Sequence, residues 1–428
     1  MLTKKFIPCI YLYHGNCVKS LKDTTIVDTN PARVAKYYNE QNADEIIIFD
    51  MSQTDEEHEE ALDIIKDICA HSEVDVFGAG NIKRMEDVKK ILYAGCKKAI
   101  LDYSIPCNIE ITEEVSLKFG MDKIWAAYSD VQVLSENKEL IEKYVSGLVL
   151  LNTHIIRETF DVTNLPVTVQ INQLALNKLF DVCSYANIYG VTGNIMNDNM
   201  KEIPALKVLF EEKGIPVNTL KAKYSWSDFK KNSEGLVPIV IQDYKTNEVL
   251  MVAYMNEAAY QTTLQTGKMC YYSRSRNEQW LKGETSGHYQ YVKSLTADCD
   301  MDTILAKVSQ TGAACHTGSY SCFFNEIYKK DYEDVSNPLK VFEDVFAVIN
   351  DRKIHPKEGS YTNYLFSKGV DKILKKLGEE ATEIVIAAKN PNPNEIKYEI
   401  SDFLYHMMVL MAEKDITWEE ITTELANR

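Results

Sequence analysis

The chain has 428 residues, of which 45% are hydrophobic and 26% charged, and it carries a formal net charge of −16 at pH 7. Two or three domains are expected at this length, and the acidic balance argues against a nucleic-acid or anionic-membrane partner. The apolar stretch 6–12 is too short for a membrane span and lacks a signal-peptide cleavage pattern, so the protein is expected to be cytoplasmic.

The first 218 residues alternate short β-branched runs with amphipathic helical stretches. This alternation predicts a (β/α)8 barrel-like domain over residues 1–218. The connection between the sixth and seventh strands is short for a full helix, which indicates a degenerate barrel. The strands are expected at 6–13, 45–51, 74–79, 98–103, 123–128, 147–153, 166–171 and 187–191.

Two further regions follow a break near residues 214–216. A strand-rich pattern predicts an α+β domain over residues 225–328. A charged connector, 329–337, then leads into a helical pattern, which predicts an all-α domain over residues 338–428. Its helices are expected at 338–351, 361–389, 394–413 and 417–427.

The ten cysteines do not predict a disulfide framework in an intracellular chain of this size. Six lie in the first half beside apolar neighbours and are expected to be buried. The other four cluster within residues 270–322, which indicates a different role.

Three carboxylates and three thiols gather in this region: Asp298, Asp300 and Asp302, and Cys299, Cys315 and Cys322. Carboxylates at alternate positions share one side of an extended segment, and anions this close favour a bound Mg²⁺. Three thiols suit Zn²⁺ and leave its fourth position open to water, as in catalytic zinc sites. Zinc would lower the pKa of that water to about 7. The alternative is buried cysteines beside an Asp-rich turn, which explains single residues better than the combination.

A polar run upstream offers side chains for a phosphorylated nucleotide: Arg274, Arg276, Trp280, Lys282, Thr285 and Ser286. The basic side chains and hydroxyls can bind phosphate, while the indole can stack on a base. By itself, such a run is also typical of a polar hairpin.

Together these residues form four motifs, Ser273-Arg274-Ser275-Arg276, Trp280-x-Lys282-Gly283-x-Thr285-Ser286-Gly287, Asp298-Cys299-Asp300-x-Asp302 and Ala314-Cys315-His316-Thr317-Gly318-x-x-Ser321-Cys322-Phe323. The region 225–325 thereby resembles phosphoribosyl-AMP cyclohydrolase, the third-step enzyme of histidine biosynthesis. The resemblance implies that the three thiols bind zinc, with Cys299 from the opposite subunit of a homodimer, and that the three aspartates bind Mg²⁺. A zinc hydroxide would add to C6 of the adenine ring, and the N1–C6 bond would break. Either His288 or His316 would shuttle protons, since imidazole titrates near neutral pH.

Carboxylates recur at helical spacing near the C-terminal end. Glu379, Glu380 and Glu383 lie within about one helical turn, and Glu399 and Asp402 are spaced by three on the next helix. Two such helices would form an acidic pocket that holds Mg²⁺ against a pyrophosphate. The alternative is a solvated charged face, but apolar neighbours place the carboxylates at the edge of a core.

The motifs here are Gly359-Ser360-Tyr361-Thr362, Lys372, Lys375, Lys376, Gly378-Glu379-Glu380-x-x-Glu383 and Glu399-x-x-Asp402-x-x-Tyr405-His406. Residues 338–428 thereby resemble phosphoribosyl-ATP pyrophosphohydrolase of the all-helical MazG-like group. The resemblance implies that the five carboxylates hold Mg²⁺ while water attacks between the α and β phosphates, with Glu380 and Glu383 as catalytic residues. Lys375 and Lys376 would contact phosphates. Fused in this order, the two domains would remove pyrophosphate from phosphoribosyl-ATP and then open the ring of phosphoribosyl-AMP.

The N-terminal motifs Phe6-Ile7-Pro8-Cys9-Ile10-Tyr11-Leu12, Gly15-x-x-Val18-Lys19 and Phe77-Gly78-Ala79-Gly80-Asn81-Ile82 resemble the histidine-pathway (β/α)8 barrels, an isomerase and a cyclase. The loop that contains Gly78 and Gly80 could bind a phosphate through its backbone N–H groups, although a glycine-rich turn is as often structural. That family's first-strand catalytic aspartate is replaced by Tyr11, and Asp130 is out of register with its second. A phenol with a pKa near 10 cannot act as a general base at pH 7. We therefore predict an inactive barrel that keeps a weak phosphosugar site or serves as a scaffold.

Three alternatives to this bifunctional enzyme are an active N-terminal isomerase that makes the chain trifunctional, a metal-binding scaffold without turnover, and a nucleotide-cleansing protein joined to a zinc deaminase. The deaminase signature, His-x-Glu followed by Pro-Cys-x-x-Cys, does not occur in the chain. Turnover of phosphoribosyl-ATP distinguishes an enzyme from a scaffold.

Overall fold

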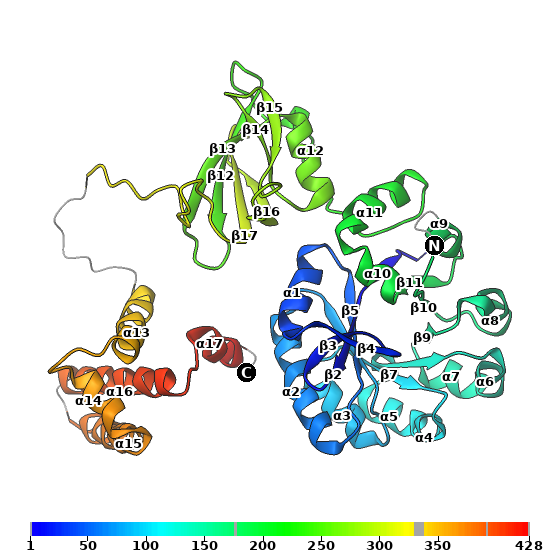
Figure 1. The fold of residues 1–428 in the computed structure, drawn as a ribbon, viewed down its shortest axis with the longest axis horizontal. Helices are drawn as coiled ribbons and strands as arrows, with labels where there is room; N and C mark the ends of the chain where they lie inside the picture. Colours follow the sequence, from blue (N-terminus) through cyan, green and yellow to red (C-terminus); the bar gives the residue numbers. More distant parts are fainter. Residues whose placement is uncertain (1, 175–177, 329–337, 391–392, 427–428) are drawn as a thin grey trace. The chain divides into compact units, whose positions relative to one another are not determined.

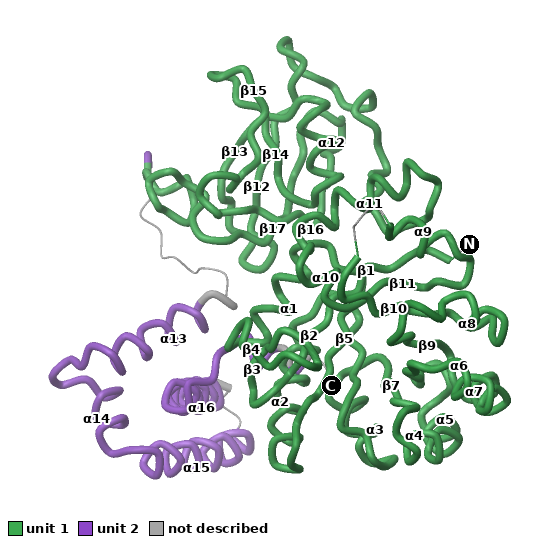
Figure 2. Tube along the Cα trace, turned by 45° about the vertical axis from the view of Figure 1, so that its right-hand side comes forward, with its two compact units in different colours: residues 1–326 green, residues 327–428 purple. Residues whose placement is uncertain are grey.

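The computed structural model describes residues 2–174, 178–328, 338–390 and 393–426. It divides into two compact units, residues 1–326 and 327–428 (Figure 2). The expected connector 329–337 lies outside the described residues. Among the described helices, none has the length and apolar character needed to cross a membrane.

The first unit contains a barrel-like row of parallel strands (Figure 1). The expected strand 6–13 is observed as β1 (Lys5–Ile7) and β2 (Cys9–Tyr13), separated by Pro8, which has no N–H to donate. β1 pairs with β11 (Ile188–Thr192), whereas β2 pairs with β5 (Glu45–Asp50). Because β1 and β2 are the two halves of one expected strand, the row of strands both begins and ends at that strand. It runs on from β5 through β6 (Asp75–Ala79), β7 (Lys98–Asp102), β8 (Ile124–Tyr128), β9 (Gly147–Leu150) and β10 (Val167–Gln170).

An antiparallel extension of this sheet differs from the expected alternation. β3 (Asn16–Ser20) and β4 (Asp23–Asp28) follow β2 before the first helix. The side chains of β4 are mostly exposed, so it lacks the apolar run that indicated the other strands.

Helices alternate with the parallel strands, and α8 is as short as the sequence predicted for the connection between the sixth and seventh strands. Asn30 caps α1 by accepting a hydrogen bond from the Arg33 backbone N–H, and Pro31 occupies the first helical position. The helices are α1 (Pro31–Glu40), α2 (Asp55–His71), α3 (Met85–Tyr93), α4 (Pro106–Glu110), α5 (Thr112–Phe119), α6 (Val131–Glu136), α7 (Lys138–Tyr144), α8 (Ile156–Val162), α9 (Leu179–Cys183), α10 (Asn194–Asp198) and α11 (Ile203–Glu212).

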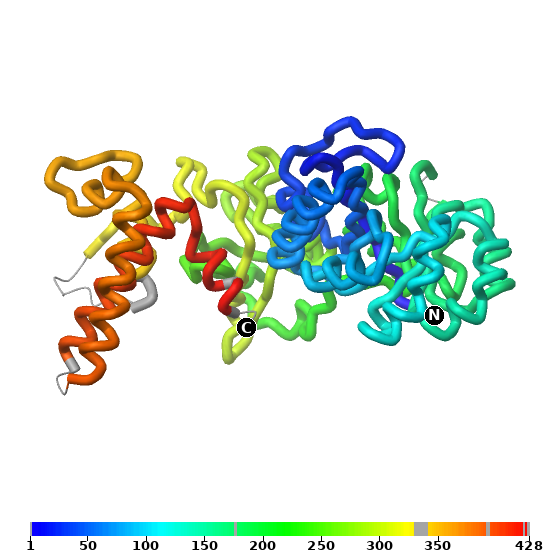
Figure 3. Tube along the Cα trace, turned by 90° about the horizontal axis from the view of Figure 1, so that it is seen from below, coloured from blue at the N-terminus to red at the C-terminus, as the bar shows by residue number. Residues whose placement is uncertain are grey.

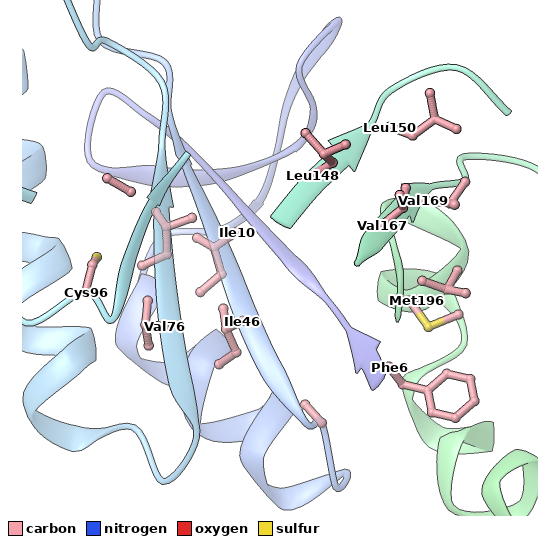
Figure 4. Packing of buried hydrophobic residues seen from close by; sticks show 14 of the residues in the cluster. Phe6, Ile10, Ile46, Val76, Cys96, Leu148, Leu150, Val167, Val169 and Met196 are labelled. Carbon is pink, nitrogen blue, oxygen red and sulfur yellow. The ribbon is translucent and has the colours of Figure 1, made fainter. Parts of the chain in front are cut away.

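Successive side chains of the strands face opposite ways and build two cores. One includes Ile10, Ile46 and Val76 together with apolar residues of the helices (Figure 4). A second cluster is built from the alternate strand positions and is rich in aromatic residues, among them Tyr11 and Trp125. Of the six N-terminal cysteines, Cys9, Cys17, Cys96 and Cys183 are buried as expected, whereas Cys69 and Cys107 are half-buried.

The rest of the first unit is strand-rich, as expected. Its four-stranded sheet has the order β13-β12-β17-β16, with β12 and β17 parallel and the other pairs antiparallel. A two-stranded hairpin and one helix complete it. The elements are β12 (Val237–Asp243), β13 (Val249–Met255), α12 (Glu257–Thr266), β14 (Cys270–Ser273), β15 (Glu278–Leu281), β16 (Gln290–Ala297) and β17 (Ile304–Gln310).

The second unit is helical in its described residues. The expected helix 361–389 is observed as α14 (Tyr361–Lys368) and α15 (Val370–Ala387), divided at Gly369, whose φ of 78° lies outside the helical range. α15 packs along α16 (Pro393–Glu413) (Figure 3). The remaining helices are α13 (Pro338–Ile354) and α17 (Trp418–Ala426).

Candidate active sites

Two of the three candidate zinc thiols come together after β17. The Cys322 backbone N–H donates to the Leu250 carbonyl of β13, which fixes this segment to the sheet. The Thr317 hydroxyl donates to Cys315 Sγ at 3.1 Å. Hydrogen bonds from the Thr317 side chain and backbone lower the pKa of Cys315, whereas burial and the neighbouring Cys315 raise the pKa of Cys322. Cys315 is thus the thiol of the pair that ionises more readily.

The third thiol, Cys299, is exposed and lies in the loop between β16 and β17. Among the described residues, no group of three ligands within 4.8 Å of one another includes these thiols. One chain therefore assembles part of the expected cysteine set.

The carboxylates of Asp298, Asp300 and Asp302 all lie within 4.8 Å of one another and are exposed. The expectation that they line one side of an extended segment is wrong, because β16 ends at Ala297 and a tight turn follows. Asp298 Oδ1 accepts the Asp302 N–H at 3.0 Å and the Thr303 N–H at 3.2 Å. Desolvation would raise the pKa of Asp298, but these hydrogen bonds outweigh it, and the pKa lies below its usual value. Three carboxylates held in this way are suited to a hard divalent cation.

Four expected site residues line a cavity of about 1020 Å³: Arg274, Arg276, Trp280 and His316. The Arg274 guanidinium lies 3.9 Å from the centre of the Tyr254 ring, and Arg276 pairs with Glu278 at 3.3 Å. The cavity therefore combines two cations, an aromatic surface and an imidazole, which are groups that recognise a phosphorylated nucleotide.

The other expected residues of this region lie outside the lining of that cavity. Lys282 is only 5% exposed and donates to the Ala313 carbonyl at 3.3 Å. His288 packs over Gly312, where an added Cβ would lie 2.5 Å from the imidazole ring. Thr285 and Ser286 are exposed in the turn before His288. Lys282 and His288 thus contact the segment that precedes Cys315.

In the second unit, Glu380, Glu383 and Glu399 place carboxylate oxygens within 4.8 Å of one another. Glu380 is 4% exposed, which makes it the buried member of this group. The neighbouring carboxylates of Glu380 and Glu399, together with some desolvation, raise the pKa of Glu383. Crowded anions of this kind are expected where a divalent cation binds.

The remaining expected residues of this unit surround that group without joining it. Glu379 pairs with Lys375 at 3.5 Å and with Lys376 at 3.0 Å, and Lys376 also pairs with Glu380 at 2.9 Å. These carboxylates raise the pKa of Lys376. The Asp402 side chain is exposed, while its carbonyl contacts His406.

Two residues to which the sequence assigned no role also approach the carboxylates. Tyr361 and His406 are hydrogen-bonded at 3.0 Å, and the same imidazole lies 3.7 Å from Glu380. Both residues are part of the sequence motifs, but only the tertiary fold brings the first turn of α14 next to α16.

The position of the missing barrel aspartate is filled by the Tyr11 ring, which is 1% exposed and stacks on Phe49 with ring centres 5.4 Å apart. Its hydroxyl accepts a hydrogen bond from Gln170, and burial raises its pKa. Asp130 caps α6 by accepting the Gln132 N–H. Gly80 has a φ of 87°, and a Cβ there would lie 2.1 Å from the Asp50 carbonyl oxygen. Each of these residues has a structural role.

Two separate groups of carboxylates that could hold a metal ion, one in each unit, are the arrangement expected of a multidomain enzyme with two sites. Family models match residues 251–324 (phosphoribosyl-AMP cyclohydrolase), residues 342–428 (phosphoribosyl-ATP pyrophosphohydrolase) and residues 5–146 (histidine biosynthesis protein).

Curated relatives that are named as one bifunctional protein match slightly less than half of this chain. The histidine biosynthesis bifunctional protein HisIE of Thermoanaerobacter pseudethanolicus is 54% identical over 209 residues, which are 46% of this chain and 97% of the relative. Those of Lactococcus lactis and Bacillus subtilis are 49% and 45% identical over 201 residues, 47% of this chain and 91% and 95% of the relatives. The chain belongs to this family of bifunctional histidine-biosynthesis hydrolases, with cyclohydrolase and pyrophosphohydrolase activities.

Proposed function

We propose that residues 225–328 form a zinc- and magnesium-dependent phosphoribosyl-AMP cyclohydrolase, and that residues 338–428 form a MazG-like, magnesium-dependent phosphoribosyl-ATP pyrophosphohydrolase. The second domain releases pyrophosphate from phosphoribosyl-ATP, and the first then opens the adenine ring of phosphoribosyl-AMP. Two observations support this proposal: Glu380, Glu383 and Glu399 converge in one domain, and the other domain holds both a group of three aspartates and the neighbouring thiols Cys315 and Cys322.

The zinc site is proposed to lie between two copies of the chain. Cys315 and Cys322 are neighbours, whereas Cys299 follows Asp298 in a separate loop of the same chain. Sulfur donors fit zinc, and a tetrahedral ion held by two thiolates still needs a third protein ligand. Cys299 of a second copy would supply it, which makes a homodimer the functional form. The zinc would acidify one water molecule so that a nucleophile is available near neutral pH.

The substrate of the cyclohydrolase is proposed to bind in the cavity that contains His316. Arg274 and Arg276 are suited to its phosphates, and Trp280 to stacking on its base. His316 is the better candidate for the proton shuttle, because it lines this cavity and adjoins Cys315, whereas His288 packs on Gly312. Thr285 and Ser286 remain candidates for phosphate contacts. Lys282 is better suited to supporting the Ala313 segment.

In the pyrophosphohydrolase, Mg²⁺ is proposed to bind Glu380, Glu383 and Glu399, with Asp402 and Glu379 next to them. The crowding that raises the pKa of Glu383 is relieved when a cation binds, which favours this assignment. Lys375 and Lys376 supply positive charge for the departing pyrophosphate.

Two variants test this division of labour in purified full-length protein supplied with phosphoribosyl-ATP, Zn²⁺ and Mg²⁺. Cys315→Ala is expected to accumulate phosphoribosyl-AMP. Glu380→Ala is expected to leave phosphoribosyl-ATP intact while still opening added phosphoribosyl-AMP. If wild-type protein leaves phosphoribosyl-ATP intact, the enzymatic assignment of the helical domain fails. If it stops at phosphoribosyl-AMP, the assignment of the cyclohydrolase domain fails.

Residues 1–218 are proposed to form a barrel without isomerase activity, because buried Tyr11 stands where the related barrels carry an acid. It serves as an assembly scaffold. Calorimetric titration of the full chain with the ring-opened product tests this role. Heat above background that is lost in a barrel variant such as Asn81→Ala would instead establish a phosphosugar site.

A further inference from the structure

Tyr361 and His406 form a hydrogen-bonded pair next to Glu380, one of the three carboxylates that converge in the second unit. His406, on α16, is 4% exposed. Its Nδ1 lies 2.8 Å from the Asp402 carbonyl oxygen, and its Nε2 lies 3.0 Å from the Tyr361 hydroxyl. A carbonyl oxygen only accepts, so Nδ1 carries a proton. In the neutral imidazole Nε2 is then the acceptor, and the Tyr361 hydroxyl donates to it.

The protonated nitrogen also faces the metal-binding group. His406 Nδ1 lies 3.7 Å from Glu380 Oε1, and Lys376 Nζ lies 2.9 Å from the same oxygen. A buried carboxylate depends on such protein partners, because little water reaches it. Glu383 is exposed and Glu399 is half-buried, so both can be solvated directly. Within the group, Glu380 is therefore the carboxylate whose orientation depends most on fixed neighbours.

We infer that Tyr361 and His406 are positioning residues, which hold Glu380 in the direction that a divalent cation requires. Tyr361 fixes the tautomer and the ring plane of His406, and the protonated Nδ1 of His406 then faces Glu380 at 3.7 Å. Hydrogen bonds to the groups that support metal ligands orient those ligands and tune metal affinity. This inference rests on the proposed magnesium site.

The chain contains a matched control for this pair. The Thr362 hydroxyl and the Tyr405 hydroxyl are hydrogen-bonded at 2.7 Å between α14 and α16, one residue along from Tyr361 and one residue before His406. This bond ties together the same two helices. The hydrogen-bond partner of Tyr405 is Thr362, whereas that of Tyr361 is the imidazole beside Glu380. Tyr361→Phe and Tyr405→Phe therefore remove the same group from the same helix pair, but only the former acts on Glu380.

The experiment measures pyrophosphate release from phosphoribosyl-ATP by the full-length protein as a function of Mg²⁺ concentration. Tyr361→Phe is expected to raise the Mg²⁺ concentration for half-maximal rate about three- to tenfold, the worth of one hydrogen bond, with a smaller change in the rate at saturating Mg²⁺. His406→Asn keeps a donor near Asp402 but does not reach Tyr361. It should therefore raise the Mg²⁺ concentration for half-maximal rate by about the same factor as Tyr361→Phe. His406→Leu removes both contacts and should have a larger effect. Tyr405→Phe should leave the Mg²⁺ dependence unchanged.

Direct binding of Mn²⁺ to the substrate-free protein, counted by electron paramagnetic resonance, provides a readout independent of turnover. Glu380→Gln gives the baseline for ions bound elsewhere in the chain. Ring opening of added phosphoribosyl-AMP should stay at the wild-type rate in every variant, which controls for folding of the preparation.

Equal shifts in Tyr361→Phe and Tyr405→Phe, or no shift in either, would overturn the positioning role and leave an ordinary helix contact. A wild-type protein whose pyrophosphate release does not depend on Mg²⁺ would instead overturn the proposed site itself. The two failures are therefore distinguishable.

Discussion

Replacing Glu45 with Gln is expected to stabilise the barrel at neutral and alkaline pH. Glu45 begins β5, is buried, and lies opposite Asp75 in the register of β5 and β6. It accepts a hydrogen bond from the Tyr189 hydroxyl, and Lys5 lies 3.8 Å away. Burial raises the pKa of this carboxyl to about 7 from its ordinary 4.5, despite these partners. Gln keeps an acceptor for Tyr189 without a charge.

The magnitude follows from linkage between ionisation and folding. The pKa of Glu45 is higher in the folded protein than in the unfolded chain. Below about pH 4.5 the carboxyl is protonated in both states, so its ionisation does not affect the free energy of unfolding. As the pH rises from about 4.5 through 7, the carboxyl ionises more readily in the unfolded chain, and the folded protein loses stability. At about 1.4 kcal/mol per pKa unit, the full loss is about 3 kcal/mol. The advantage of Glu45→Gln should therefore grow by about 2 kcal/mol between pH 5.5 and pH 7.5, and then level off.

The assay is urea unfolding of the full chain at a series of pH values. Trp125 fluorescence reports on the barrel, because the centre of its ring lies 5.2 Å from the centre of the Tyr189 ring. The other three tryptophans are replaced by Phe in both the wild-type and the variant protein. Glu60→Gln, which changes an exposed carboxylate of α2, is the control and should not alter the pH dependence. A Glu45→Gln protein whose advantage is the same at pH 5.5 and 7.5 would refute the reasoning.

Further predictions concern the barrel and both sites. Gly80→Ala should destabilise the barrel by about 2–4 kcal/mol in urea, because its φ is 87° and its Cβ would lie 2.1 Å from a carbonyl oxygen. Tyr11→Phe should cost about 1 kcal/mol for the lost Gln170 hydrogen bond, whereas Tyr11→Asp should cost about 3–5 kcal/mol without creating isomerase activity. Trp280→Ala should raise the KM for phosphoribosyl-AMP about tenfold or more, through loss of stacking worth about 1–3 kcal/mol, and leave pyrophosphate release unchanged. A zinc chelator should stop ring opening while pyrophosphate release in excess Mg²⁺ continues.

The sequence predicted the parallel strands well because their burial on both faces produces continuous apolar runs, such as 46–49 within the strand expected at 45–51. It missed β3 and β4, whose mostly exposed side chains lack that signal. The division at Gly369 was visible as a glycine inside a helical pattern, but glycine is tolerated in helices at modest cost, so only the observed backbone reveals the interruption.

Candidate site residues that are close together in the sequence could be related to one another without the structure, whereas those brought together by tertiary packing could not. The carboxylates of Glu380 and Glu383 are one helical turn apart and do converge, while Asp298 and its neighbours converge through a turn rather than through strand alternation. Tyr361 and His406 are 45 residues apart. No local pattern relates them, because their contact depends on how α14 and α16 pack.

The division of the first strand at Pro8 has a consequence for how the barrel forms. The parallel pairing of β1 with β11 joins residues about 185 apart in the chain, whereas β2 pairs with β5 at a separation of about 38 residues. The loop-closure entropy of the first pairing is correspondingly larger, and contacts this distant slow folding. During synthesis, β2, β5 and β6 can associate early, while the pairing of β1 with β11 must wait until β11 has left the ribosome. Closure of the barrel should therefore be a late folding step, in which substitutions in β1 change the unfolding rate more than the folding rate.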